Sequence, residues 1–275
     1  MRGSGGTCRR LVRRRSTSAH TSTPRSVTVS SKSDLAALER VGALVAQALQ
    51  LMERETRPGL STAQLDAIGE RFLRQHGARS APQLSYDFPG FTCLSVNDQI
   101  VHGVPGPRVL APGDVVKIDV TAELDGYVAD AAITVTLPPV SAEARRLRKC
   151  AHRAFDCAMA VARAGTPIRE IGRVVEEEVK RHDFAVVREM CGHGVGRSIH
   201  ETPSVPNYYS MLTRGVLTEG MVLAVEPIIS ARAARVVEEP DGWTLRTDNG
   251  ALAAHYEHTV VIRRGEPLVI TKLAA

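Results

Sequence analysis

The chain has 275 residues, and 43% of them are apolar, which is enough to bury one large core or two small ones. No apolar run approaches the roughly 18 residues that span a bilayer, so the pattern predicts neither a transmembrane segment nor a membrane partner. The formal net charge is +5, but residues 1–33 hold eight of the 35 Lys/Arg and none of the 30 Asp/Glu, which leaves −3 for the remainder. A role in nucleic-acid binding would therefore depend on the first 33 residues alone.

Residues 1–33 are rich in Arg, Ser and Thr and contain no acidic residue. They lack the apolar stretch of a secretory signal. The composition favours a disordered basic extension, while an organellar transit peptide and a segment that contacts ribosomal RNA remain alternatives. We expect a single folded domain over residues 34–275.

The five cysteines are odd in number and scattered, without a C-x-x-C pair. This pattern argues against a disulfide scaffold and favours reduced thiols in a reducing compartment, which predicts a cytoplasmic location. Cys150 and Cys157 lie in a predicted helix and are interpreted as small core residues.

The first half of the domain reads as two helices followed by strands. The apolar spacing predicts a helix that begins after Ser33 or Asp34 and ends before residues 58–59. A second helix begins at Ser61, where Gln64 completes a capping box, and ends at Gly77. Strands and turns dominate residues 86–138.

The second half repeats this order. Helices are predicted over 142–164 and over 167–181, the latter with Thr166 as its cap and Pro167 at its first position. Residues 184–275 read as strands broken by turns at 240–242 and 249–250.

The two halves also resemble each other in detail. Residues 111–119 (APGDVVKID) match residues 218–226 (TEGMVLAVE), and each apolar run ends on a carboxylate. This repeat predicts an α+β fold with a pseudo-twofold axis, in which helices cover one face of a curved antiparallel sheet. Carboxylates at matching strand positions would meet near that axis.

Four carboxylates interrupt segments that otherwise read as buried strands: Asp119, Asp130, Glu226 and Glu257. If the hairpin folds about the midpoint of residues 124 and 125, Asp119 and Asp130 lie opposite each other, with Cβ atoms about 4.5–5.5 Å apart. Buried carboxylates this close must share a proton or bind a cation, unless the pair is solvated at a sheet edge. A single such glutamate is more often exposed, but four in one domain favour cations.

His193 lies in a glycine-rich segment, residues 192–196. The spacing is not G-x-G-x-x-G, which disfavours a phosphate-binding loop, and Ser204 rules out H-E-x-x-H after His200. Four oxygen donors and one imidazole exceed the ligand set of a single zinc and suit two divalent ions that share bridging carboxylates. The oxygen-rich donor set is compatible with Mn, Fe, Co or Zn.

From about residue 35 to 272, these motifs resemble type I methionine aminopeptidases, whose fold is called pita-bread. The resemblance implies that Asp130 and Glu257 bridge two metal ions, that Asp119 chelates the second ion, and that His193 and Glu226 hold the first. It implies a monomeric cytoplasmic hydrolase that removes the initiator methionine from nascent polypeptides when the second residue is small. Residues 34–275 would form its catalytic domain.

The same resemblance implies catalytic roles for His102, His200 and Glu226. Glu226 would accept a proton from the attacking water and pass it to the leaving amine, while His200 would donate to the developing oxyanion. The methionine pocket would be walled by seven residues: Tyr86, Phe88, Cys93, His102, Ile199, His200 and Trp243. For Trp243, packing on a hairpin is the alternative interpretation.

Three positions depart from the family's commonest pattern. Asp98 stands where Glu is usual, residues 128–129 (Val-Ala) stand where His-Gly is frequent, and His255 stands where Gln is usual. None belongs to the implied ligand set, so we expect them to tune metal preference or rate. Aminopeptidase P and prolidase share the five ligands but usually carry a large N-terminal domain. A non-catalytic pita-bread binding protein usually lacks some of the ligands.

Overall fold

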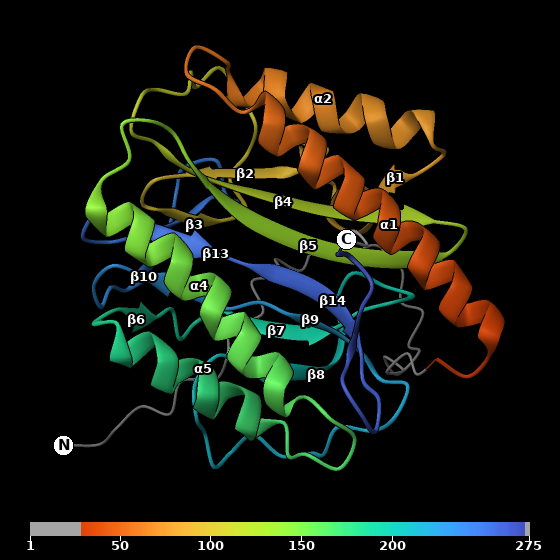
Figure 1. Ribbon diagram of the computed structural model, residues 1–275. Coiled ribbons are helices and arrows are strands. Elements are labelled where there is room, and N and C mark those ends of the chain that lie inside the picture. The colour runs from red at the N-terminus through yellow and green to blue at the C-terminus, as the bar shows by residue number, and fades with distance from the viewer. Residues whose placement is uncertain (1–28, 273–275) are drawn as a thin grey trace.

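A nine-stranded antiparallel sheet occupies the centre of the molecule, and α1, α4 and α5 cross one face of the strands with α2 beside α1 (Figure 1). The computed structural model describes residues 29–272. The helices are α1 (Lys32–Glu55), α2 (Thr62–Gln75), α3 (Ala81–Tyr86), α4 (Ala142–Val161) and α5 (Arg169–Arg181). The strands are β1 (Arg79–Ser80), β2 (Cys93–Val96), β3 (Gln99–Val101), β4 (Val115–Leu124), β5 (Tyr127–Thr136), β6 (Ala185–Val186), β7 (Cys191–Gly194), β8 (Glu201–Pro206), β9 (Val222–Val225), β10 (Ile228–Ser230), β11 (Val236–Glu238), β12 (Leu245–Thr247), β13 (Ala253–His255), β14 (Glu257–Val261) and β15 (Leu268–Val269).

The order of strands reflects the sequence repeat. The main sheet runs β1-β4-β5-β14-β9-β7-β8, with β2 paired to β4 and β15 paired to β14. The β4–β5 hairpin of the first half therefore lies beside the β14–β9 pair of the second half, and the halves meet between β5 and β14. Two small sheets, β13-β10-β6 and β11-β12-β3, complete the fold. The predicted α+β architecture is confirmed.

Each half has its own apolar core. One core joins buried residues of α1 and α2 to those of β4 and β5, and the other joins α4 and α5 to β9 and β14. On β4, the even-numbered residues from Val116 to Ala122 belong to the first core. Because side chains alternate along a strand, Lys117, Asp119 and Thr121 point to the opposite face of the sheet, away from α1.

The helix α1 begins slightly before the predicted position. Ser31, rather than Ser33 or Asp34, is the N-cap and accepts a hydrogen bond from the backbone N–H of Asp34. The N–H of Val29 donates to the carbonyl of Gly220 at 2.7 Å, so structure begins inside the predicted extension. The rest of that extension, residues 1–28, lies outside the described residues.

By length and composition, α1 is the one described helix that could cross a membrane, although the sequence predicted no such segment. Half of its apolar window is buried in the molecule, and its buried face packs on β4 and β5. A core helix of a globular protein has the same properties, so this finding is weak evidence for a membrane span.

Local capping signals in the sequence predict the start of α2 correctly but not the start of α5. Ser61 and Gln64 form the predicted capping box at α2. The helix α5, however, starts at Arg169 without a side-chain cap, so the prediction of Thr166 as its cap is wrong. The reason is tertiary: residues 166–168 bond to residues 215–217 instead, with Leu217 N–H donating to Thr166 O at 2.8 Å.

The β4–β5 hairpin differs from its predicted register. Leu124 pairs with Tyr127, and the two-residue turn at Asp125 and Gly126 has positive φ angles of 53° and 81°. An Asp-Gly turn of this kind matches the twist of the strands, which fixes the register at the turn. Asp130 therefore faces Thr121, and Asp119 faces Ala132. The prediction that Asp119 and Asp130 are directly opposite is wrong; they are diagonal neighbours on one face.

Candidate metal centre

The five predicted metal ligands lie on five strands that are adjacent in the main sheet. The sheet order β4-β5-β14-β9-β7 carries Asp119 on β4, Asp130 on β5, Glu257 on β14, Glu226 directly after β9, and His193 on β7. Residues up to 138 positions apart in sequence are thereby brought to one place. The sequence predicted that these five side chains converge, and the order of strands brings them together.

One group of donor atoms forms around His193. The ligand atoms of Asp130, His193 and Glu257 all lie within 4.8 Å of one another. His193 Nε2 is 3.3 Å from Glu226 Oε1 and 4.0 Å from Asp130 Oδ2. The other ring nitrogen, Nδ1, lies 3.0 Å from the carbonyl oxygen of Gly194. A backbone contact of this kind orients an imidazole so that Nε2 is directed at a metal.

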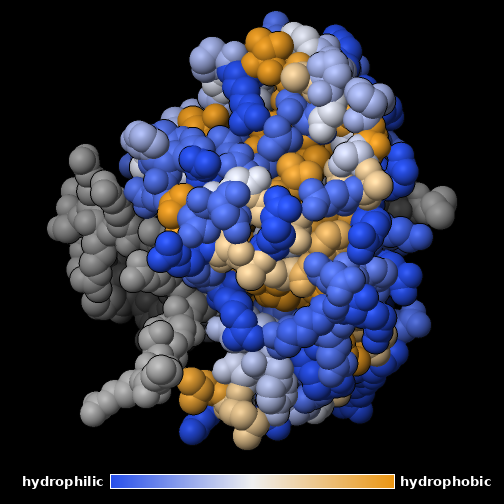
Figure 2. Space-filling view, turned by 90° about the vertical axis from the view of Figure 1, so that its left-hand side faces the viewer, coloured by the Kyte–Doolittle hydropathy of each residue, from blue (hydrophilic) through white to orange (hydrophobic). Residues whose placement is uncertain are grey.

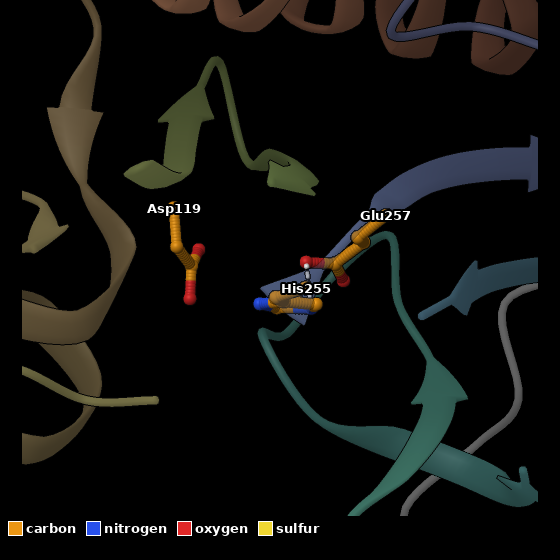
Figure 3. A group of neighbouring side chains, drawn as sticks. All are labelled: Asp119, His255 and Glu257. Carbon is orange, nitrogen blue, oxygen red and sulfur yellow. Dashed lines mark ion pairs between the residues drawn. The ribbon is translucent and has the colours of Figure 1, made fainter. Parts of the chain in front are cut away.

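A second group includes a residue outside the predicted set. Donor atoms of Asp119, His255 and Glu257 also lie within 4.8 Å of one another (Figure 3). Glu257 belongs to both groups, as a carboxylate shared between two neighbouring cation sites would. The sequence analysis treated His255 only as a departure from a family pattern. The signal that could have found it is its spacing, because residues 255 and 257 lie on the same side of an extended chain.

A bend in the second half of the sheet explains this convergence. The chain passes from β9 to β10 at Glu226 and Pro227, and from β13 to β14 at Tyr256. The two crossings are adjacent, since Ile228 pairs with His255 on one side and Val225 pairs with His258 on the other. At this point both segments of the chain pass between the main sheet and the small β13-β10-β6 sheet. The bend therefore gathers Glu226, His255 and Glu257.

The electrostatics of the group require a counter-charge. Burial and the neighbouring carboxylates raise the pKa values of Asp119, Glu226 and Glu257 well above their usual range, and burial raises that of Asp130 to about 7. Within residues 29–272, Asp119 Oδ1 and Glu257 Oε1 are buried without a hydrogen-bond partner. Such groups stay ionised in a protein interior when they bind cations. The donor set fits divalent metal ions.

The hydroxyl groups of two threonines hold Asp130 in position. Thr121 donates from Oγ1 to Asp130 Oδ1 at 2.7 Å. Thr259 Oγ1 accepts from the backbone N–H of Asp130 and donates to its carbonyl oxygen, both at 2.8 Å. Asp130 is thus fixed by both its side chain and its backbone, and sequence reasoning had identified neither threonine.

Of the two predicted non-ligand histidines, His200 lies beside the centre. The ring of His200 is 4.3 Å from that of His193, and its Nδ1 is 2.6 Å from the hydroxyl of Tyr86. Tyr86 ends the short helix α3, which the sequence analysis did not predict. His102 has a left-handed backbone with φ 57°, and burial lowers its pKa to about 4, so its imidazole is neutral near neutral pH.

Some of the predicted pocket residues contact one another, and Cys93 lies opposite a predicted metal ligand. The rings of Phe88 and Trp243 meet edge to face, with 5.2 Å between their centroids. Trp243 therefore packs on a residue that is far from its own hairpin in the sequence. Cys93 pairs with Asp119 between β2 and β4, and burial and nearby carboxylates raise the pKa of its thiol. Ile199 is buried next to His200 in the chain. A role for these residues in binding methionine remains a prediction.

Two other sequence expectations concern residues outside the donor groups. Asp98 binds Arg246, with 3.0 Å between Oδ2 and Nε, and belongs to neither donor group. Cys93, Cys150 and Cys157 are free thiols, as expected.

Known proteins match the chain over nearly its whole length. Residues 36–264 match the model of metallopeptidase family M24. Methionine aminopeptidase 2 of Bacillus subtilis is 42% identical over 247 residues, which cover 89% of this chain and 99% of that protein. Methionine aminopeptidase of Staphylococcus epidermidis is 39% identical over 248 residues, covering 89% and 98%.

Solved structures show the same relationship. Methionine aminopeptidase from Thermotoga maritima superimposes with a TM-score of 0.85 at 31% identity, covering 91% of this chain and 100% of that one. Prolidase from Pyrococcus furiosus has a TM-score of 0.71 at 22% identity and is covered over 65% of its length, which shows a likeness in fold alone. The predicted resemblance is confirmed, and the chain belongs to metallopeptidase family M24, as a relative of its methionine aminopeptidases.

Proposed function

We propose that this chain is a methionine aminopeptidase, which removes the N-terminal methionine of nascent polypeptides when the second residue is small. The observation that carries the proposal is the arrangement of one imidazole and four carboxylates, three buried and one half-buried, on or directly after five adjacent strands. Curated methionine aminopeptidases that are about as long as the folded part of this chain support it. A monomeric state and a cytoplasmic location are proposed with it, on the strength of the resemblance.

The centre would hold two divalent cations from among Co, Mn, Fe and Zn. Asp130 and Glu257 would bridge them, His193 and Glu226 would complete one position, and Asp119 would complete the other. Bound ions of this kind supply an acidic water molecule and polarise a carbonyl group. The two donor groups that share Glu257 support this division.

The chain's own residues would then move the protons. Glu226 lies against both histidines of the centre, 3.3 Å from His193 and 3.6 Å from His255, in a position to accept a proton from water and pass it to the leaving amine. When His200 carries its proton on Nε2, its Nδ1 accepts a hydrogen bond from Tyr86. In this tautomer, His200 donates from Nε2 to the oxyanion that develops on the scissile carbonyl.

The substrate's side chain would be recognised by apolar and neutral groups. Phe88, Cys93, Ile199 and Trp243 present apolar surface, and His102 is neutral. An unbranched thioether suits such surroundings, because sulfur makes favourable contacts with aromatic rings. Contact of the basic N-terminal segment with the ribosome is an alternative to disorder, and residues 1–28 of that segment lie outside the described residues.

The test is a peptide assay on the purified full-length chain with added Co, Mn, Fe or Zn. We expect Met-Ala-Ser to be cleaved to Met and Ala-Ser in the presence of a divalent metal, and an Ala-Pro peptide to resist cleavage. Asp119→Asn should abolish cleavage while the fold survives by circular dichroism. The matched control is Asp125→Asn, the same change at the exposed tip of the same hairpin, where Asn is also tolerated at positive φ.

Two results would contradict the proposal. Faster cleavage of the X-Pro peptide would favour a prolidase-like enzyme, although the solved enzymes of that kind are covered over only about two thirds of their length. An Asp119→Asn variant as active as the unaltered chain would refute the assignment of the centre.

A further inference from the structure

We infer that His255 is a sixth protein ligand of the metal centre, bound through Nε2 to the cation on the Asp119 side. The inference rests on the proposed two-cation function, but it concerns a residue that the five-ligand set does not include. It gives the second cation position an imidazole, where the five-ligand set supplies that position with carboxylate oxygens alone.

The position of His255 is the first argument. It is the last residue of β13, and Glu257 is the first residue of β14, so both side chains leave the bend on the same side (Figure 3). His255 Nε2 lies 3.4 Å from Glu257 Oε2 and 3.6 Å from Glu226 Oε2, and it shares the group of donor atoms with Asp119.

These distances decide between two interpretations. A charged imidazolium paired directly with a carboxylate has a shorter contact, with about 2.7–2.9 Å between nitrogen and oxygen. Donor atoms that each lie about 2.0–2.2 Å from one ion are about 2.8–3.1 Å apart at the right angles of an octahedron and about 3.3–3.6 Å apart in a tetrahedron. The 3.4 Å contact of Nε2 with Glu257 Oε2 matches the tetrahedral spacing of two ligands around a shared cation, whereas Glu226 Oε2, at 3.6 Å, belongs to a residue assigned to the other cation.

Unsatisfied polar atoms are the second, independent argument. The imidazole is only 2% exposed, and neither of its nitrogens has a hydrogen-bond partner in the described part of the chain. Buried polar groups normally have partners, because leaving them unpaired costs free energy. Asp119 Oδ1 and Glu257 Oε1 are buried and unpaired beside it. A single cation among the three would provide a partner for Nε2 of the imidazole and for the unpaired oxygens of Asp119 and Glu257.

The added imidazole predicts a change in metal preference. Nitrogen donors favour cobalt and zinc, whereas manganese is best served by carboxylates and water. The Asp119 side of the centre should therefore bind cobalt with a larger advantage over manganese than a site with oxygen donors alone.

The test compares His255→Gln with the unaltered full-length chain after chelation of bound metal. Glutamine is the residue usual at this position in the resembling family, so the variant should fold. We expect His255→Gln to bind one of two Co(II) ions at least about tenfold more weakly by calorimetry and to change the visible absorption bands of bound Co(II). Its affinity for Mn(II) should fall by less than threefold. His152→Gln, the same change at an exposed histidine of α4, should change neither metal affinity nor the bands.

The readouts keep this inference separate from the proposed function. Equal Co(II) affinity and identical Co(II) bands in His255→Gln and the unaltered chain would overturn the inference, even if Met-Ala-Ser is cleaved. Tighter Co(II) binding by the variant would also overturn it, since it would mean that the imidazole competes with the metal. Loss of one Co(II) in the variant would support it, even if no methionine is released by either protein.

Discussion

The two halves of the sheet position their predicted metal ligands by different structural features. In the first half, Asp119 and Asp130 stand in a hairpin with ten consecutive residue pairs, and the alternation of side chains alone puts them on one face. In the second half, Glu226, His255 and Glu257 stand at a bend, where β9 and β14 end after four shared pairs and the chain passes to another sheet. A regular hairpin can place only two donors so near each other, whereas a bend gathers three.

This difference assigns distinct roles to the halves. The hairpin supplies oxygen donors whose spacing is set by backbone hydrogen bonds that exist without metal. The bend supplies both oxygen and nitrogen, and in the described residues it has three unpaired atoms, Glu257 Oε1 and both ring nitrogens of His255, against the single Asp119 Oδ1 of the hairpin. We therefore expect loss of metal to disturb the second half more than the first.

The largest effect should come from the carboxylate common to both donor groups. Glu257→Gln removes the shared oxygen charge, so both cations should bind poorly and kcat/KM for Met-Ala-Ser should fall by about 10³-fold or more. Metal content per chain, measured after dialysis, should fall with it. Glu219→Gln, the same change at an exposed residue, is the control. Full metal content in Glu257→Gln would show that the halves do not share this carboxylate.

A smaller effect should follow from the hydroxyl that fixes Asp130. Thr121→Val keeps the shape of the side chain but removes the hydrogen bond to Asp130 Oδ1. Loss of such an orienting partner typically weakens metal binding about 10–100-fold. Calorimetric titration with Co(II) measures it. Thr134→Val, a buried threonine of the same strand pair that bonds to His255 backbone instead, tests whether the bend needs similar support.

Equal losses in the two threonine variants would remove the distinction between the halves. A larger loss in Thr121→Val would show that the hairpin carboxylate needs its side-chain partner even though the backbone already holds it.

Removing the metal should make stability depend on pH. Burial raises the pKa of Asp130 in the folded chain to about 7, while in the unfolded chain it is near its ordinary value of about 3.9. The folded state therefore holds a proton that the unfolded state releases, and this contribution is lost as pH rises toward 7 and above. His102 and His255 act oppositely, but only below about pH 6.5, where their unfolded forms gain a proton.

Lys117 also titrates above this pH with the opposite sign to Asp130: burial lowers its folded pKa to about 7, so its contribution to stability rises with pH in the chelated and the metal-loaded protein alike. The effect of the carboxylates is therefore the difference between these two forms from about pH 6.5 to about pH 8. In that window, the Tm of the chelated protein relative to that of the metal-loaded protein should fall by several degrees as pH rises. Thermal unfolding followed by circular dichroism measures both. Parallel curves for the two forms would mean that ionised carboxylates are tolerated in the centre without a cation.

How far the sequence could predict this molecule differs between the halves as well. The repeat, the helix pattern and the interruption of apolar runs by Asp119, Asp130, Glu226 and Glu257 sufficed for the fold and for the carboxylate positions. These features are local or follow from alternation along a strand. The bend is not local, because it depends on two crossings between sheets that lie 30 residues apart in the chain. The proximity of His255 to the centre was therefore missed.

The errors in the predicted helix and hairpin boundaries have different causes. Thr166 resembles a good cap, but its carbonyl and its neighbours bond to residues 215–217, a partner that no local pattern reveals. In the hairpin, the local signal was present and was misplaced: Asp125 and Gly126 form the turn, not the point between residues 124 and 125. Asp119 and Asp130 kept their common face because the shift was an even number of residues.

The smallest expected effect tests that turn. Gly126 has a φ of 81°, and a Cβ there would have room, since only the end of Arg197 lies within 4 Å. Gly126→Ala should therefore lower the free energy of unfolding by about 1–2 kcal/mol through backbone strain alone. Urea unfolding measures it, and Gly265→Ala, where space is open and φ is not positive, should have little effect.

Because ten residue pairs hold the hairpin, the Co(II) affinity of Gly126→Ala should stay within about twofold of the unaltered chain. If affinity fell in proportion to stability, the hairpin would be as dependent on its surroundings as the bend, and the contrast between the two halves would not hold.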